Sequence, residues 1–210
     1  MPGRSLFRIL GVPIALVVLG AVLVVPNMTL ATSGVTFNQS ITGTLDIGIV
    51  DGSGNTVGSP SITFSSKTFT ASGQTSTGTL GSASQKMRVT NPTSTATWAL
   101  TVAATSGNTT LWSDGSNTMD FNGSASAGRL TVDASGSTLA GVGGTSTSNI
   151  TKGSSTSFVQ GTTDSITLLS AGGSAAAPGQ WDLTSVSLTQ DIPALQATGN
   201  YSIGMTLTAS

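Results

Sequence analysis

Apolar and polar residues alternate in short runs along most of this chain, a pattern typical of half-buried β-strands. In the run 44–50, Leu45, Ile47 and Ile49 share one face. The run 201–207, near the end of the chain, alternates most regularly. The same pattern predicts further strands at 61–64, 68–70, 86–91, 97–103, 109–112, 119–121, 129–132, 156–160 and 165–170.

Turn-forming residues separate these runs. The cluster 51–55 reads Asp-Gly-Ser-Gly-Asn, and its Gly and Asn residues tolerate positive φ. Pro92 ends the run before it, because proline has no N–H to donate to a strand ladder. The apolar positions change phase after Leu183, which predicts a β-bulge near Thr184 or Ser185.

Residues 134–155 are mostly Gly, Ser and Thr with scattered apolar residues. We expect a long surface loop there, with at most one weak edge strand. The runs after the N-terminal segment show no helical period. At least eight short strands separated by turns predict an all-β fold: a single antiparallel β-sandwich or jelly-roll-like domain.

The N-terminal segment differs from the rest of the chain. Arg4 and Arg8 precede an unbroken apolar run at 9–25, and small residues follow Pro26. These features indicate a signal peptide over 1–31, which leaves a domain at 32–210 and a secreted protein at the extracellular cell surface. The apolar run is also just long enough to span a bilayer, so a retained N-terminal membrane anchor is the alternative.

Composition narrows the class of protein further. Only 7% of the residues are charged, against about 25% in ordinary globular proteins, and cysteine is absent. The eight acidic residues are all Asp and seven residues are basic, so the chain has no basic surface for nucleic acid. Hydrophobic residues make up 37%, enough to exclude a disordered chain. Hydroxyl groups must therefore supply most of the solubility.

The residues needed for catalysis are scarce, and we expect no enzyme. A serine nucleophile needs a base, but the chain contains no histidine and no Ser-x-x-Lys sequence. Glycoside hydrolysis needs two carboxyl groups with separated pKa values, and here only single Asp residues in turns and on strands are available.

One short segment has the composition of a metal site. Asp114, Asn117, Asp120 and Asn122 offer oxygen ligands of the kind that calcium takes in irregular loops, and calcium is the only cofactor that the sequence suggests. The spacing does not match an EF-hand, and clusters of Asp, Asn and Gly form turns without an ion. A turn is the favoured interpretation.

The three tryptophans fall into two groups. Trp98 and Trp181 each alternate with a leucine, which predicts that both indoles belong to the core. Trp112 lies next to Ser113 and Asp114 at a strand end. We expect it nearer the surface, as a candidate ligand contact.

Trp98-Ala-Leu100-Thr and Trp181-Asp-Leu183-Thr form a pair of Trp-x-Leu units separated by most of the domain. Together with the N-terminal signal and the closing Y-S-I-G-M-T-L-T run after a proline, they resemble the paired motifs of the WxL cell-surface domain of bacteria. The resemblance implies an antiparallel β-sandwich attached non-covalently to the bacterial cell wall. Trp98, Leu100, Trp181 and Leu183 would be the attachment residues.

Three functional hypotheses remain open. The first is an exported, non-catalytic protein attached to a cell-wall polymer. The second is a structural subunit of a surface filament or layer that assembles with itself or other surface proteins through strand edges, with residues 32–40 as a donor strand. The third is an adhesin that binds an extracellular glycan or protein through Trp112 and the segment 134–155.

Overall fold

The computed structural model describes residue 36 and residues 38–210, so the predicted signal segment 1–31 lies outside the described residues. The chain divides into residues 1–40 and a second unit, 41–210, which contains every strand that the structure describes. This second unit is all-β, and its antiparallel sheets pack together as the sequence predicted.

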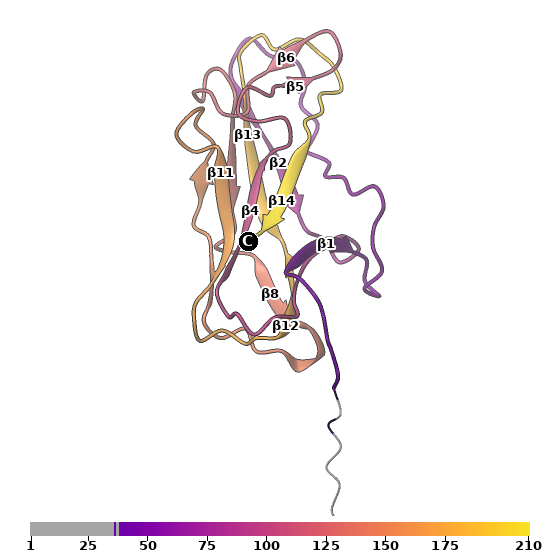
Figure 1. Cartoon of the computed structure of the whole chain (residues 1–210). Coiled ribbons are helices and arrows are strands. Elements are labelled where there is room, and N and C mark those ends of the chain that lie inside the picture. Colours follow the sequence, from indigo (N-terminus) through magenta and orange to yellow (C-terminus); the bar gives the residue numbers. More distant parts are fainter. Residues whose placement is uncertain (1–35, 37) are drawn as a thin grey trace, which may run out of the picture. The chain divides into compact units, whose positions relative to one another are not determined.

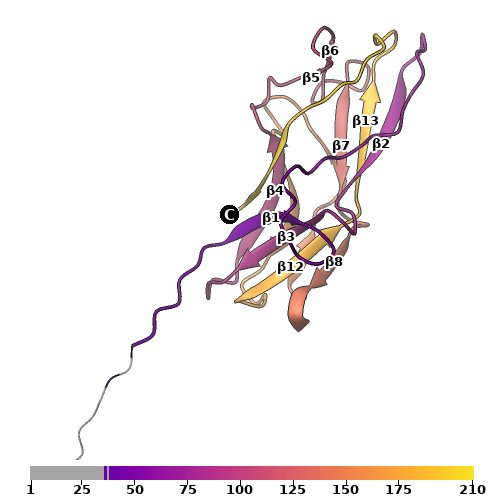
Figure 2. The ribbon, with the colours of Figure 1, turned by 90° about the vertical axis from the view of Figure 1, so that its right-hand side faces the viewer.

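Three long segments build one side of the sandwich, and each bends in the middle. Each contributes one strand to a lower sheet, ordered β1-β3-β12-β8, and another to an upper sheet, ordered β10-β7-β13-β2 (Figure 2). The segments are β2 (Gln74–Leu80) with β3 (Lys86–Asn91), β7 (Arg129–Asp133) with β8 (Thr138–Gly141), and β12 (Gly179–Thr184) with β13 (Val186–Ile192). β1 (Asp46–Val50) and β10 (Thr156–Ser157) each add one edge strand to these sheets.

A third four-stranded sheet faces the upper sheet, as Figure 1 and Figure 2 show. Its order is β14-β4-β11-β9, and its neighbours are all antiparallel. The strands are β4 (Trp98–Ala104), β9 (Ile150–Lys152), β11 (Ser165–Ala171) and β14 (Met205–Ala209). The remaining elements are the hairpin β5 (Trp112–Ser113) with β6 (Thr118–Met119) and the 3-10 turn η1 (Val142–Gly144).

Side chains that alternate along the strands fill the space between the sheets. In β4, Trp98, Leu100, Val102 and Ala104 point inward and are buried, while the Ala and Thr residues between them are half-buried. The largest fully buried side chains are Trp181, Phe121 and Phe158. Because the strands supply these residues at period two, the sequence pattern determines which face is buried.

The sequence predicted a β-bulge near Thr184 or Ser185, and the chain instead bends at Ser185, between β12 and β13. Ser185 has φ 63°, and its N–H donates to the Gly81 carbonyl over 2.8 Å. Gly81, on the neighbouring segment, also has positive φ, at 82°. Both strands therefore turn at the same level, which lets one segment serve two sheets.

The structure also corrects the sequence interpretation in several places. The segment 134–155 is not one long loop, because it contains β8, η1 and β9. Residues 61–64 and 68–70 form no strand. β2 was not predicted, because its sequence, Gln-Thr-Ser-Thr-Gly-Thr-Leu, is polar at almost every position. β2 carries few apolar residues, so its hydrophobic pattern is weak.

Residues 38–210 include no helix that is long and apolar enough to span a membrane.

Candidate functional site

An apolar groove of about 760 Å³ lies between the edges of the sandwich. One wall is β14 with the residues just before it, and the other is β1 with the end of β2. The volume falls within the range of ligand pockets, roughly 300–1,000 Å³. The wall residues that matter most are Ile47, Ile49, Leu80, Ile203, Met205 and Leu207.

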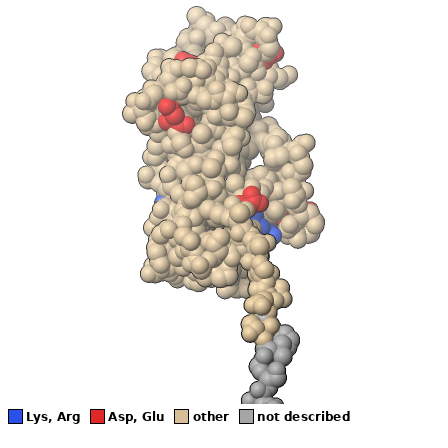
Figure 3. All heavy atoms as spheres, in the orientation of Figure 1, with Lys and Arg blue, Asp and Glu red and all other residues tan. Residues whose placement is uncertain are grey.

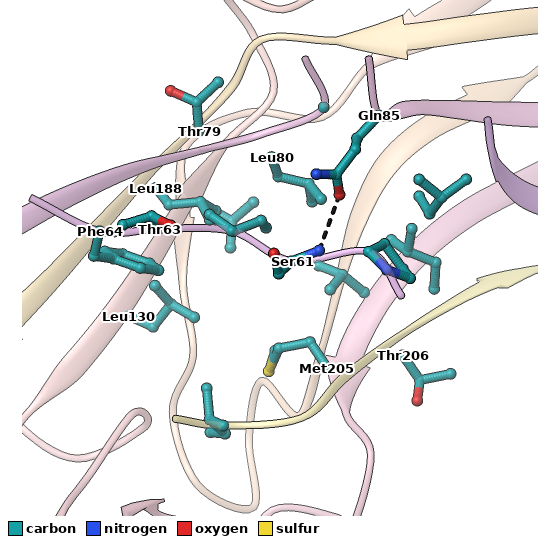
Figure 4. A pocket seen from close by; sticks show the side chains of 18 of the residues that line it. Ser61, Thr63, Phe64, Thr79, Leu80, Gln85, Leu130, Leu188, Met205 and Thr206 are labelled. Atoms are coloured by element: carbon teal, nitrogen blue, oxygen red, sulfur yellow. Dashed lines mark hydrogen bonds between the residues drawn. The ribbon is translucent and has the colours of Figure 1, made fainter. Parts of the chain in front are cut away.

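The floor of the groove is the hydrophobic core itself. Val102, Leu130, Val132 and Leu188 line it, and all four belong to the buried cluster between the sheets. In Figure 4, the side chains of Leu80, Leu130, Leu188 and Met205 converge on the open space. The sandwich is thus incompletely closed on this side.

Among the described residues, one edge of β14 has no hydrogen-bonded strand partner at the groove, although part of β1 lies within 8 Å of β14. In the described part of the chain β14 pairs only with β4, from Met205 opposite Ala104 to Ala209 opposite Leu100. Met205 points into the groove, and the more exposed Thr206 also borders it (Figure 4). A free edge with alternating apolar side chains offers backbone hydrogen bonds to an added strand.

A strap of irregular chain, Pro60 to Phe64, crosses the groove. Few bonds hold it: the Ser61 N–H donates to Gln85 Oε1 over 2.9 Å (Figure 4), and the next residue, Ser65, donates its N–H to the Thr77 carbonyl over 2.7 Å. A second hollow, of about 490 Å³, also borders the strap. The strap therefore covers the core without the close packing of a strand.

The groove is electrically neutral. None of the described residues that line it is charged. The face shown in Figure 3 carries few charged side chains and is hollowed beside β14. Apolar side chains and uncharged polar groups therefore make up its lining, which suits the binding of an uncharged, partly apolar segment.

The two Trp-x-Leu units meet in the interior, as the core prediction required. Trp98 and Trp181 pack with ring centroids 5.1 Å apart and are only 4% and 0% exposed. Leu100 and Leu183 are fully buried. The Trp181 indole N–H donates to the Ser146 carbonyl over 2.9 Å. These four side chains hold the sheets together and are not presented to a ligand at the surface.

Trp112 is not at the surface, and the expectation of an exposed indole was wrong. It is 9% exposed, and its N–H donates to Gln190 Oε1 over 2.9 Å. Phe64 of the strap packs edge-on against it, with ring centroids 5.4 Å apart. The strand-end position suggested exposure, but the strap covers the ring. Trp112 still lines the groove from within.

The calcium candidates are engaged as turn and packing residues. The Asp114 carboxylate accepts the backbone N–H groups of Ser116 and Asn117 over 2.8 and 2.6 Å. The pKa of Asp114 is lowered, and the hydrogen bonds from Asn117 contribute most to this. Asn122 is buried and donates its amide to the Asn108 carbonyl.

Among the described residues, none donates a hydrogen bond to the Asp120 carboxylate. The Asp120 backbone carbonyl accepts a bond from the Gln190 side-chain amide. Within the described residues, no cluster of three or more acidic, His or Cys side chains forms. Residues 114–117 form a turn, in which the Asp114 N–H donates to the Asn117 carbonyl over 3.2 Å.

A buried ion pair lies outside the groove, between β3 and β12. Asp182 is 8% exposed and accepts two bonds from Arg88, at 2.7 and 2.8 Å. Lys86 approaches the same carboxylate at 3.5 Å. The hydrogen bonds from Arg88 hold the pKa of Asp182 below its ordinary value of 3.8, although burial acts in the opposite direction. The pair fixes strand register rather than forming a reactive site.

The sequence signals did not predict the groove, because it depends on which strand edges remain unpaired. The alternation at 201–207 predicted one wall, but nothing local showed that β14 ends a sheet. No protein-family model, curated protein or solved structure matches this chain.

Proposed function

We propose that this chain is an exported, non-catalytic cell-surface protein that assembles by accepting an extended strand of another chain in the groove beside β14. The observation that carries the proposal is an uncharged apolar groove that reaches the core and runs along a free strand edge. The signal-like segment 1–31 supports export, and the scarcity of acid–base residues supports a non-catalytic role.

Strand addition fits both features of the groove. The free edge of β14 supplies backbone hydrogen bonds, which give affinity without depending on sequence. The apolar hollow receives every second side chain of the added strand, which gives selectivity. A low surface charge also allows subunits to approach closely without repulsion.

The test is the concentration dependence of sedimentation for the exported protein and for a Met205→Asp variant. An aspartate in the groove would be buried without a partner when a strand is added, so we expect assembly to be lost. Val159→Asp, at a 44% exposed position outside the groove, is the matched control and should assemble like the wild type. Assembly by all three proteins would contradict the proposal.

Wall attachment is the second candidate, favoured by one observation: two Trp-x-Leu units far apart in sequence form a single packed pair. Because their side chains are buried, contact with a wall polymer would use the surface around them. Protein that pellets only together with isolated cell wall, and does so equally with Met205→Asp, would support this candidate over assembly through the groove.

A further inference from the structure

The alternation of β1 continues into the segment before it. Every second residue from Val35 to Ile49 belongs to one series: Val35, Phe37, Gln39, Ile41, Gly43, Leu45, Ile47 and Ile49. Most of the series is apolar, yet β1 begins only at Asp46. The sequence therefore contains more strand-forming pattern than the sheet uses.

Ile41 shows this clearly. Its side chain is 89% exposed, the highest exposure among the large hydrophobic residues that the structure describes. Residues 41–45 make no backbone hydrogen bond to any other described residue. An exposed isoleucine on a chain with free backbone groups is suited to pairing with another sheet edge.

The segment and the groove match in chemistry. Residues 32–45 contain no charged side chain, and neither does the described lining of the groove. The single polar member of the segment's apolar series in this stretch, Gln39, can meet polar lining groups such as Ser82 and Gln85. At about 3.3 Å per residue, five to seven residues of the segment are enough to run along β14.

We propose that residues 33–43 of a second copy of this chain occupy the groove as an added strand. Their backbone pairs with the free edge of β14, and Val35, Phe37 and Ile41 point toward the core. A second copy is required because the same chain's Ile41 is exposed to solvent and not in the groove. This inference rests on the proposed function and names the strand that the groove accepts.

The consequence is a directional assembly. Each copy carries one groove and one donor segment, so the contact joins two different surfaces. Such a contact continues from copy to copy, as a ring or an open filament, rather than closing as a symmetric dimer.

A synthetic peptide of residues 33–43 provides the test. Labelled peptide should bind the exported protein, and excess unlabelled peptide should block assembly. A peptide in which Val35, Phe37 and Ile41 are all serine should bind about a hundredfold more weakly or worse, because most of its buried apolar area is lost. In the full chain, Phe37→Ser with Ile41→Ser should abolish assembly, and this variant should melt at the same temperature as the wild type when both are compared at a dilution at which the wild type is monomeric.

Three results distinguish the inference from the proposed function. Suppose that the peptide has no effect and that the Phe37→Ser, Ile41→Ser variant assembles normally while Met205→Asp does not. Residues 33–43 are then not the added strand, but the proposal that the groove accepts a strand is retained. If the variant melts at a lower temperature than the wild type at a dilution at which both are monomeric, the segment fills its own groove and the inference fails. If the wild type stays monomeric at every concentration, both proposals fail. If Met205→Asp fails to fold, Ile62→Asp on the strap replaces it, since Ile62 is already 38% exposed.

Discussion

Asp182 is the buried acid among the described residues, and its partners explain how it is tolerated. Arg88 binds it through two nitrogens, which compensates for the loss of hydration. Because the two residues lie opposite each other on β12 and β3, a slip in register would separate the charges. At the scale of single residues, this pair therefore specifies the register of β12 against β3 as well as adding stability.

Removing Arg88 should therefore be costly. We expect Arg88→Ala to lower the free energy of unfolding by about 3 kcal/mol at pH 7, because Asp182 would remain buried without its main partner. Urea unfolding measures this change. Lys67→Ala, a removal of charge from the segment after the strap, is the control and should change stability little.

The same pair predicts how stability depends on pH. Since the pKa of Asp182 is lowered in the folded state, its contribution is fully present above the unfolded value of about 3.8. That contribution is lost as the pH falls below 3.8 through the folded pKa. Asp182→Asn should therefore be less stable than the wild type at pH 7 and lose less stability between pH 5 and 2. Parallel stability curves for the two proteins would contradict this assignment.

The packed tryptophans give a second prediction at this scale. Trp181→Ala should lower the free energy of unfolding by about 3–5 kcal/mol, since the indole is fully buried and hydrogen-bonded. Trp98→Ala should lower the free energy of unfolding less in a Trp181→Ala background than in the wild type, because the two rings contact each other. A double-mutant cycle by chemical denaturation measures the coupling, and strictly additive losses would contradict it.

At the scale of elements, the bend between the upper and lower sheets determines the architecture. Adjacent segments bend at Gly81 and at Ser185, which are joined by a backbone hydrogen bond. A side chain at Gly81 would also place its Cβ 2.9 Å from the Cα of Thr184. Positive φ and close approach therefore both require glycine there.

Gly81→Ala should accordingly destabilise the protein by about 1–2 kcal/mol or more. Gly136→Ala is the matched control, because a Cβ there meets no atom within 4 Å and its φ is not positive. Thermal unfolding of both variants tests the prediction. Equal melting temperatures would mean that the bend does not depend on Gly81.

The strands also show which parts of the fold could be predicted from the sequence alone. Two alternating runs were predicted well: β3 matches 86–91 at both ends, and β4 is shifted by one residue from 97–103. The most regular run, 201–207, was predicted less well, because β14 begins only at Met205 and continues to Ala209. β2 was missed because its outward and inward positions are almost equally polar. β8 and β9 were missed because Gly, Ser and Thr dominate their segment, and only pairing with β12 and β11 makes them strands.

The candidate site was harder to predict than the fold. The burial of Trp98 and Trp181 follows from local alternation, so the sequence was sufficient. The burial of Trp112 depends on a strap about fifty residues earlier in the chain, which no local pattern reveals. The groove likewise exists only because β1 and β14 are edge strands of different sheets.

At the scale of the whole molecule, the neutrality of the groove and donor segment sets the response of assembly to salt. Exposed charges are screened over about 10 Å at 0.1 M salt, but this contact has none to screen. Assembly should therefore persist from about 0.01 to 1 M sodium chloride. Light scattering across this series tests the prediction, and dissociation at high salt would point to a charged interface elsewhere.

The most direct measurement is a mixing experiment with two variants that are each defective in one half of the contact. The Phe37→Ser, Ile41→Ser protein lacks a donor segment, and the Met205→Asp protein lacks a usable groove. Each variant alone should sediment as a monomer. Their equimolar mixture should form heterodimers and nothing larger, because only one intact groove and one intact segment remain. Monomers in the mixture, or assemblies in either single sample, would contradict the account.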